Sequence, residues 1–210
     1  MASSGPTSPQ PIHQPAPQPS PQASPKASPE PIQTPNLEPT PTGEILANVA
    51  GEIPTVEVSF KALQQLELSP LAPWAQLPTD ALLQRGPCLA LNLHWHRQAD
   101  DPRELSEIAE VRLWSLRADA AYPWLPLVLE RSSGQLTRHV AMLLPHSFSR
   151  TEGIRFAPES LELWITHRVL WLDGWARGQG LHCRQGLTQM AAVLGFELDP
   201  TLWAAVDGLS

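Results

Sequence analysis

Proline is distributed so unevenly along this chain that its two ends must be read separately. Thirteen of the 24 prolines lie in residues 1–43, together with one lysine, two acidic residues and no aromatic residue. A segment of this composition buries too little apolar surface to offset the entropy lost on ordering. We therefore expect residues 1–43 to form a disordered Pro/Ser/Gln-rich tail and residues 44–210 to form a single folded domain.

The folded part carries the side chains that a hydrophobic core needs. Residues 44–210 contain all eight tryptophans, the single tyrosine and all four phenylalanines. A domain of this size buries roughly 68–70% of its unfolded surface, so it needs neither disulfides nor a metal to fold. The only two cysteines, Cys88 and Cys183, fit a reducing compartment, and we expect a cytoplasmic protein.

The charge balance excludes one class of partner. Residues 44–210 hold 19 acidic and 13 basic residues, a net charge of −6, whereas nucleic-acid phosphates require a basic face. The most apolar stretch, Leu161 to Trp175, is interrupted by polar and charged residues. It does not reach the roughly 20 apolar residues of a membrane span, so we expect neither nucleic-acid binding nor membrane insertion.

Local patterns predict three strands or strand pairs. Residues 55–58 read as a strand that leads into a helix capped by Ser59. Residues 88–96 alternate between apolar and polar side chains, which is typical of a half-buried strand. The apolar runs 126–130 and 135–144 flank Ser132-Ser133-Gly134, an arrangement that predicts a hairpin.

Helix signals gather towards the C-terminus. Asp101-Pro102-Arg103-Glu104 has the residues of a helix start, and Pro158 opens the longest helix, which ends at Gly178 or Gly180. Further helices are expected at residues 184–194 and after Asp199-Pro200. The longest helix should turn one apolar face inwards, formed by Leu161, Trp164, Ile165, Trp171, Leu172 and Trp175. The fold class is therefore α+β, with a small, mainly antiparallel sheet that includes a hairpin and with helices concentrated at the C-terminal end.

Histidines provide the one weak sign of catalysis. His94 and His96 stand two residues apart on a predicted strand, so both rings point to one side, as metal ligands can. A small metal-dependent hydrolase would need a third ligand such as His139 or His146. The sequence contains no known nucleophile, phosphate or dinucleotide motif, so we expect no catalytic residues, no cofactor and a polar sheet face at these histidines.

Two segments are candidates for binding a partner protein. Residues 101–107, DPRELSE, concentrate charges that serve either as a capping box or as a recognition edge. Residues 122–126, YPWLP, place two large aromatic side chains between prolines, for core packing or as an interface anchor. The candidate partner-binding residues are Asp101, Arg103, Glu104, Glu107, Tyr122, Trp124 and His146.

Arg168 is out of place in the predicted apolar face of the longest helix. A buried cation needs either aromatic faces or an acidic partner. We therefore expect Arg168 to stack on the neighbouring tryptophans or to pair with a buried acid.

Four blocks of sequence resemble a known family. They are DPRELSEIAEVRLW (101–114), RADAAYPWLPLVLE (117–130), QLTRHVAMLLPHSF (135–148) and EGIRFAPESLELWITHRV (152–169). In order and content they are similar to the signature blocks of the chlororespiratory reduction 6 family, over roughly residues 55–205. The chain departs from that pattern at Ala109 and Ser147.

The resemblance implies a non-enzymatic role. Members of this family are maturation factors for NdhI, an iron–sulfur subunit of the photosynthetic NAD(P)H dehydrogenase-like complex of cyanobacteria and chloroplasts. It thus implies a protein partner, NdhI, in a cyanobacterial cytosol, with transient contact to a thylakoid-bound complex and no active site to carry over. A proline-rich scaffold that acts mainly through residues 1–43 is a third hypothesis.

Overall fold

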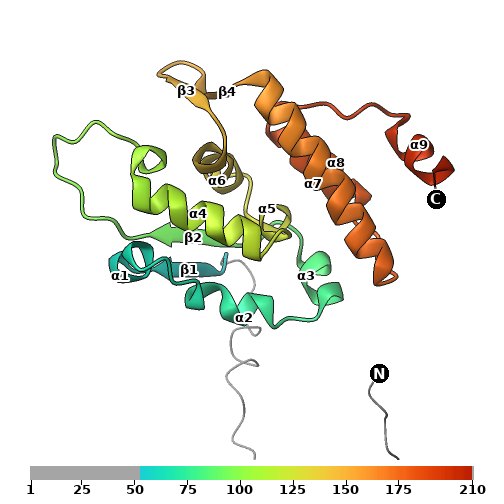
Figure 1. The fold of residues 1–210 in the computed structure, drawn as a ribbon, viewed down its shortest axis with the longest axis horizontal. Helices are drawn as coiled ribbons and strands as arrows, with labels where there is room; N and C mark the ends of the chain where they lie inside the picture. The colour runs from blue at the N-terminus through green and yellow to red at the C-terminus, as the bar shows by residue number, and fades with distance from the viewer. Residues whose placement is uncertain (1–52, 210) are drawn as a thin grey trace, which may run out of the picture. The chain divides into compact units, whose positions relative to one another are not determined.

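The computed structural model describes residues 53–209 of the chain. The predicted tail, residues 1–43, and the predicted domain boundary at residue 44 lie outside the described residues. Residues 53–209 are coloured in Figure 1.

Short helices and strands alternate in the first half of the described chain, and longer helices follow (Figure 1). The strands are β1 (Thr55–Val58), β2 (Ala90–Leu93), β3 (His146–Ser149) and β4 (Gly153–Phe156). The α-helices are α1 (Phe60–Gln64), α2 (Ala72–Ala75), α3 (Thr79–Arg85), α4 (Ala109–Ala121), α5 (Leu125–Val128), α6 (Gln135–Leu143), α7 (Pro158–Gly178), α8 (Arg184–Val193) and α9 (Leu202–Gly208). Two short 3-10 helices, η2 (Ser69–Leu71) and η3 (Leu105–Glu107), complete the elements.

The α+β fold class is confirmed, but the strands form two separate pairs. β3 and β4 form an antiparallel hairpin, whereas β1 and β2 pair in parallel, with Thr55 opposite Ala90 and Val58 opposite Leu93. A parallel pair needs a crossover connection, and the segment containing α1, α2 and α3 supplies it. The prediction for residues 55–58 and for the alternation along 88–96 is confirmed, although β2 spans only four residues.

The predicted hairpin at residues 126–144 is wrong, because both of its arms are helical. Burial raises the pKa of the Glu130 carboxyl, but hydrogen bonds from the hydroxyls and backbone N–H groups of Ser132 and Ser133 outweigh it and lower the pKa to about 2. These bonds wrap the turn around the carboxylate, and Gly134 then takes a left-handed backbone conformation with φ of 78° as α6 begins. The turn residues therefore start a helix instead of joining two strands.

The helix predicted to start at Asp101 begins later. Asp101 binds Arg103, residues 105–107 form only the 3-10 turn η3, and α4 starts at Ala109 behind Ile108. Helix α4 then continues to Ala121.

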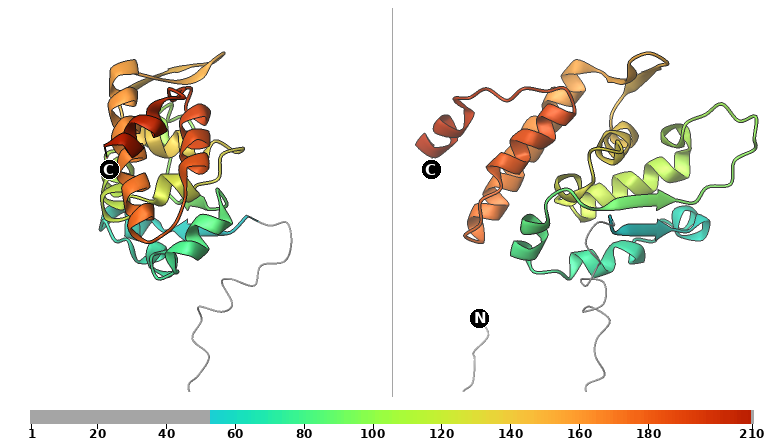
Figure 2. Two further views of the ribbon diagram at one scale, coloured as in Figure 1. Left: turned by 90° about the vertical axis from the view of Figure 1, so that its right-hand side faces the viewer. Right: turned by 180° about the vertical axis from the view of Figure 1, so that it is seen from behind.

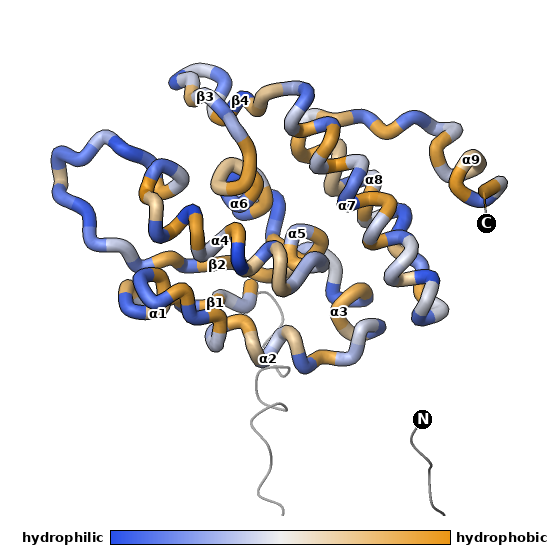
Figure 3. The backbone as a smooth tube through the Cα atoms, in the orientation of Figure 1, coloured by the Kyte–Doolittle hydropathy of each residue, from blue (hydrophilic) through white to orange (hydrophobic). Residues whose placement is uncertain are grey.

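Helix α4 is central to the core. Its Trp114 is fully buried and donates its indole N–H to the Glu67 carbonyl oxygen at 2.8 Å. Ser115 and Ala118 face inwards on the same helix, and α4 packs against α1, α6 and η3. Figure 3 shows hydrophobic colours along α5, which packs on α4 and α8.

Helix α7 begins at Pro158 and ends at Gly178, as predicted, and it buries most of the predicted face. The inward residues are Leu161, Ile165, Val169, Leu172, Asp173 and Ala176. Trp171 is 40% exposed, whereas Trp164 and Trp175 are half-buried and pack against the core. Asp173 is also buried, and its carboxylate is bound by Arg184 at 2.9 Å and by Arg177 at 3.0 Å.

Helix α8 packs against α7, and α9 follows it at the C-terminal end. Figure 2, seen from behind, shows α8 in front of α7, and the two helices are in contact. Arg184, the first residue of α8, also binds Asp207 of α9 and stacks on Trp203 at 4.8 Å from the ring centroid. One arginine thus connects α7, α8 and α9.

Candidate partner-binding surface

The charged segment 101–107 is held in a fixed shape by its own ion pair. Arg103 donates to the Asp101 carboxylate from Nη2 at 2.8 Å and from Nε at 3.0 Å, and its backbone N–H donates at 3.1 Å. These hydrogen bonds lower the pKa of Asp101 to about 2. Arg97 donates to the Asp101 carbonyl oxygen at 3.1 Å. The segment therefore presents a preformed charged edge and not a helix cap.

A serine links this edge to the hairpin. The Ser106 hydroxyl lies 3.5 Å from Glu104 Oε2 and 3.4 Å from His146 Nε2. His146 Nδ1 donates to the Leu144 carbonyl oxygen at 3.0 Å, and the imidazole meets the edge of the Phe156 ring. The structure therefore brings together Glu104 and His146, two residues that are 42 positions apart in the chain.

Beside this link lies a groove of about 680 Å³. Its apolar lining consists of Leu105, Ala141, Met142, Phe148, Ile154 and Val193, and charged side chains at its margin are Arg97, Glu104, Arg138 and Glu152. The groove thus lies between η3, α6 and the β3–β4 hairpin. We call it the η3–α6 groove.

The hairpin supplies an unpacked aromatic wall to the η3–α6 groove. His146, Phe148, Ile154 and Phe156 share one face of the hairpin, because side chains on a strand alternate and these residues pair across it. His146 and Phe156 are half-buried at the base, whereas Phe148 is 60% exposed nearer the tip. An apolar side chain of this size facing a groove is the usual anchor of a binding surface.

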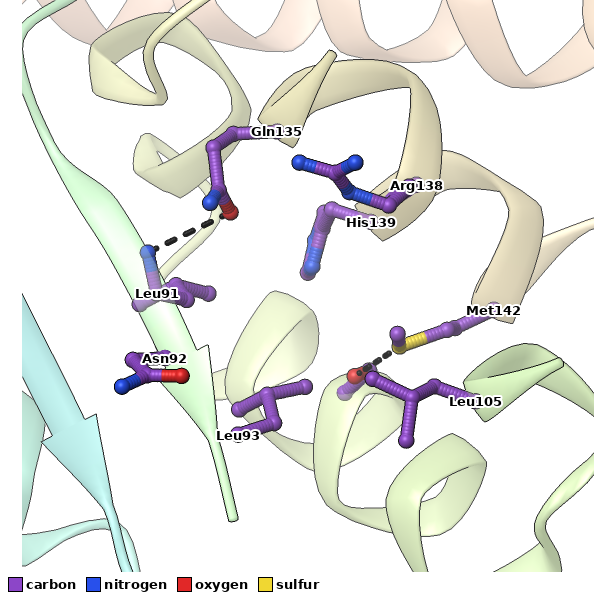
Figure 4. Close-up of a pocket in the computed structure, with 9 residues that line it drawn as sticks. Leu91, Asn92, Leu93, Leu105, Gln135, Arg138, His139 and Met142 are labelled. Atoms are coloured by element: carbon purple, nitrogen blue, oxygen red, sulfur yellow. Dashed lines mark hydrogen bonds between the residues drawn. The ribbon is translucent and has the colours of Figure 1, made fainter. Parts of the chain in front are cut away.

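A smaller hollow of about 280 Å³ adjoins the groove and shares Leu105, Arg138 and Met142 with it. Figure 4 shows its lining from β2, α6 and η3. The Gln135 side chain accepts from the Leu91 N–H at 3.3 Å, and the Ser115 hydroxyl donates to the Met142 sulfur at 2.8 Å. These bonds join α6 to β2 and to α4 beside the groove.

The aromatic segment 122–126 lies at the other end of α4. Trp124 is 8% exposed and belongs to the core, and Tyr122 packs on it with ring centroids 5.5 Å apart. The structure therefore separates the predicted partner-binding residues. One group precedes α4 or adjoins its start and consists of Asp101, Arg103, Glu104, Glu107 and His146. The other group, Tyr122 and Trp124, follows the end of α4.

Arg168 satisfies both alternatives predicted for it. Its guanidinium binds the buried carboxylate of Asp119 and lies 5.8 Å from the centroid of the Trp164 ring. Asp119 also accepts a hydrogen bond from His139 Nε2 at 3.2 Å. This buried cluster joins α4, α6 and α7, which makes it structural.

The histidines needed for a hydrolase lie in different surroundings. His94 binds Glu57 at the surface, His96 packs on the ring of Phe60, and His139 is bound to Asp119. Among residues 53–209, no three His, Cys, Asp or Glu side chains gather where they could hold a metal ion. The hydrolase hypothesis therefore lacks the third ligand that it needs.

Sequence reasoning missed the apolar half of the candidate surface. Phe148, Ile154 and Val193 were not predicted to bind a partner, and Arg97 and Arg138 were not singled out. Phe148 offered one local signal, since it stands between two serines in a polar strand, HSFS. The other residues come from separate elements, so their meeting depends on the tertiary structure.

A protein-family model described as chlororespiratory reduction 6 matches residues 58–205. The chain belongs to this family. The match includes every residue that lines the η3–α6 groove. Membership of the chlororespiratory reduction 6 family links the chain to assembly of the NAD(P)H dehydrogenase-like complex.

Two further findings accompany this membership. No solved structure matches the chain. Within residues 53–209, none of the helices has both the length and the apolar character to cross a bilayer.

Proposed function

We propose that this chain is a non-enzymatic assembly factor that helps to incorporate the iron–sulfur subunit NdhI into the photosynthetic NAD(P)H dehydrogenase-like complex. The family supports the assembly role. The observation that carries the docking part of the proposal is the η3–α6 groove, an apolar hollow with charged side chains at its margin, into which Phe148 is exposed.

The composition of the groove suits a protein partner. Transient protein interfaces bury an apolar centre and keep a polar, solvent-accessible rim. Leu105, Met142 and Ile154 provide the centre, while Arg97 and Glu152 provide charges of both signs at the margin. Such charges set the register and exclude wrong partners more than they add affinity.

The preformed edge at residues 101–104 lowers the entropy lost on binding. Its Asp101–Arg103 pair is already made in the free protein, so the partner does not need to order it. The proposed mechanism is that the groove and this edge cover an immature surface of NdhI until neighbouring subunits replace them. The factor then leaves without any covalent step and without a cofactor.

The proposal extends to location and to the tail. The factor acts in a cyanobacterial cytosol and meets the thylakoid-bound complex only transiently. NdhI recognition belongs to the domain that begins near residue 44, and residues 1–43 act as a solubilising extension.

A pair of matched variants tests the docking surface. Phe148→Thr removes an exposed ring from the groove but keeps a residue that favours strands. Loss of one well-buried aromatic contact should weaken NdhI binding about 10-fold to 100-fold, measured by titrating purified NdhI with the full chain.

Leu113→Gln is the control for that titration. Leu113 is 51% exposed on α4 and lies outside the groove, and glutamine suits a helix. Both variants should retain the wild-type unfolding midpoint. Equal NdhI affinity for wild type and Phe148→Thr would remove the groove from the proposal.

A further inference from the structure

Another cavity, of about 310 Å³, lies where α5 contacts α3 and α8. Its apolar side chains are Leu82, Leu83, Pro87, Leu127 and Val128, and its polar side chains are Arg131, His182, Gln185 and Gln189. Within residues 53–209, no aspartate or glutamate lines it. The cavity therefore combines an apolar wall with a positive charge. We call it the α5–α8 cavity.

The guanidinium of Arg131, in the wall of this cavity, is bound by neutral acceptors at long distances. Nη2 donates to the carbonyl oxygens of Gly186 at 3.2 Å and Leu127 at 3.5 Å, and Nη1 donates to Gln189 Oε1 at 3.3 Å. Its Nε is buried and has no hydrogen-bond partner among residues 53–209. Hydrogen bonds from a guanidinium to a carboxylate are usually shorter, about 2.7–2.9 Å. The donors of Arg131 are thus only partly satisfied.

No carboxylate of the described chain neutralises this arginine. None of the ion pairs among residues 53–209 involves Arg131, and the neighbouring Glu130 carboxylate accepts from Ser132 and Ser133. Burial lowers the pKa of the Arg131 guanidinium, as it does when a cation loses water without gaining an opposite charge. A half-buried cation is costly unless an anion pairs with it.

The surroundings of Arg131 add no negative charge to the cavity. Burial and the nearby Asp173 raise the pKa of the Cys183 thiol to about 11, so this lining residue stays neutral. Gln185 and Gly186, in the first turn of α8, also line the cavity, and the side chain of Cys183 does not cap the helix. A Cβ at Gly186 would lie 3.3 Å from the Leu127 side chain. Glycine therefore lets the start of α8 approach α5 closely.

We propose that the α5–α8 cavity binds a small organic acid, with its carboxylate on Arg131 and its apolar body against Leu83 and Leu127. Gln189 is exposed, so its amide can turn into solvent and leave Nη1 to the ligand. A planar guanidinium matches a carboxylate better than it matches a single amide oxygen. The volume lies at the lower end of small-molecule sites, which range over about 300–1,000 Å³.

This site is separate from the surface proposed for NdhI. The α5–α8 cavity and the η3–α6 groove have no lining residue in common. Binding of an organic acid therefore goes beyond the proposed function, and its test needs no NdhI.

An NMR titration of the full chain with three probes tests the site. Benzoate carries both a carboxylate and an apolar ring, benzamide has the ring without the charge, and inorganic phosphate has charge without the ring. Benzoate should bind with a Kd on the order of 1 mM and shift the Arg131 Nε–H signal. Benzamide and phosphate should each bind at least about 10-fold more weakly.

Three results of this titration would overturn the proposal. Absence of benzoate binding up to about 20 mM would remove the site altogether. Equal affinity for benzamide would show that the charge of Arg131 plays no part. Tighter binding of phosphate would make this a site for inorganic anions and not for an organic acid.

Gln189→Glu supplies a carboxylate from the chain itself. Its side chain replaces the amide that contacts Arg131 Nη1 at 3.3 Å, and glutamate suits a helix as well as glutamine does. The unliganded variant should melt about 1–4 °C above the wild type, because the guanidinium gains a counter-ion. Benzoate affinity should fall at least about 10-fold. Wild-type benzoate affinity in this folded variant would contradict binding at Arg131.

Ala192→Glu is the matched control. It adds the same charge to an exposed position of the same helix, outside the cavity, and should keep benzoate affinity within about two-fold of the wild type. Arg131→Lys keeps the charge but loses the planar fork, so benzoate should bind about 10-fold more weakly. Its unfolding midpoint is measured alongside, because Arg131 also binds Gly186. A folded Arg131→Lys that binds benzoate like the wild type would refute the proposed geometry.

Discussion

At the scale of single residues, carboxylates shape the loops of this protein. Asp101 and Glu130 each collect hydrogen bonds from residues two or three positions ahead. In both places, these local hydrogen bonds give a structure that differs from the one predicted from the sequence pattern. The Asp101 interaction prevents a helix from starting at residue 101, and the Glu130 interaction turns a predicted hairpin into the entry to α6.

Glu130 should make stability depend on pH at the acidic end. Its folded-state pKa of about 2 lies below the ordinary glutamate value of about 4.5, so its contribution is complete above pH 4.5 and is lost as the pH falls towards 2. Glu130→Gln removes the charge but keeps an acceptor, and should lower the unfolding free energy by about 1–2 kcal/mol at pH 7.

Urea unfolding of wild type and Glu130→Gln, at pH 7 and at pH 2.5, measures this effect. The difference between the two proteins should shrink at pH 2.5, because the carboxyl of the unfolded wild type is protonated there, whereas the folded carboxyl, with a pKa of about 2, is still largely ionised. A difference that stays constant between the two pH values would assign the loss to packing and not to the charge.

The charged edge at residues 101–104 predicts a loss of binding without a loss of fold. Asp101→Asn, Arg103→Gln and Glu104→Gln together remove charges at the surface, where substitutions usually change stability by less than about 0.5 kcal/mol. Capture of NdhI should fall by about 10-fold, mainly through slower association at low salt. Surface plasmon resonance at two salt concentrations checks this, and unchanged capture by the folded variant would refute a recognition role.

At the scale of elements, the buried cluster of Asp119, His139 and Arg168 holds α7 against α4 and α6. Breaking one side of a buried ion pair leaves the other charge unpaired, so Arg168→Met should cost about 3–5 kcal/mol. Adding Asp119→Leu removes the stranded charge, and the double variant should be more stable than Arg168→Met alone.

Chemical denaturation of the wild type, the two single variants and the double variant gives a double-mutant cycle, which measures the interaction energy between Asp119 and Arg168. Arg155→Met is a suitable control, because its ion pair with Glu152 is exposed and such pairs contribute little. Additive losses from Asp119→Leu and Arg168→Met would mean that the two residues do not act as a pair.

Elements with strong local signals could be predicted from the sequence. Ser59 caps α1 by accepting the Ala62 N–H at 3.2 Å, Pro158 opens α7 and the alternation along β2 is present, all as expected. The parallel pairing of β1 with β2 could not be predicted, because the two strands are far apart in sequence and nothing local fixes a partner. The inward face of α7 was predicted from helical periodicity, and Leu161, Ile165 and Leu172 are buried as expected. The burial of Asp173 could not be predicted, because its partner Arg184 belongs to another helix.

The candidate site was only half predictable for the same reason. The charged edge lies in one continuous segment, so the sequence showed it. The η3–α6 groove needs side chains from η3, α6, the hairpin and the end of α8, and no spacing in the chain brings these together. That the exposed Phe148 lines a groove can be seen only once the residues around it in the tertiary structure are known.

At the scale of the whole molecule, the η3–α6 groove is the surface that we propose for NdhI binding. The η3–α6 groove combines apolar lining with charges of both signs, as a regulated, reversible contact with NdhI requires.

The central claim is that the folded domain recognises NdhI during assembly of the NAD(P)H dehydrogenase-like complex. The most direct test is an affinity pull-down of the tagged chain from a cyanobacterial lysate, with and without residues 1–43, followed by mass spectrometry of the bound proteins. The account predicts that NdhI is enriched with both forms and is reduced by Phe148→Thr in either form. Absence of NdhI from both forms, while the complex is being made, would contradict it.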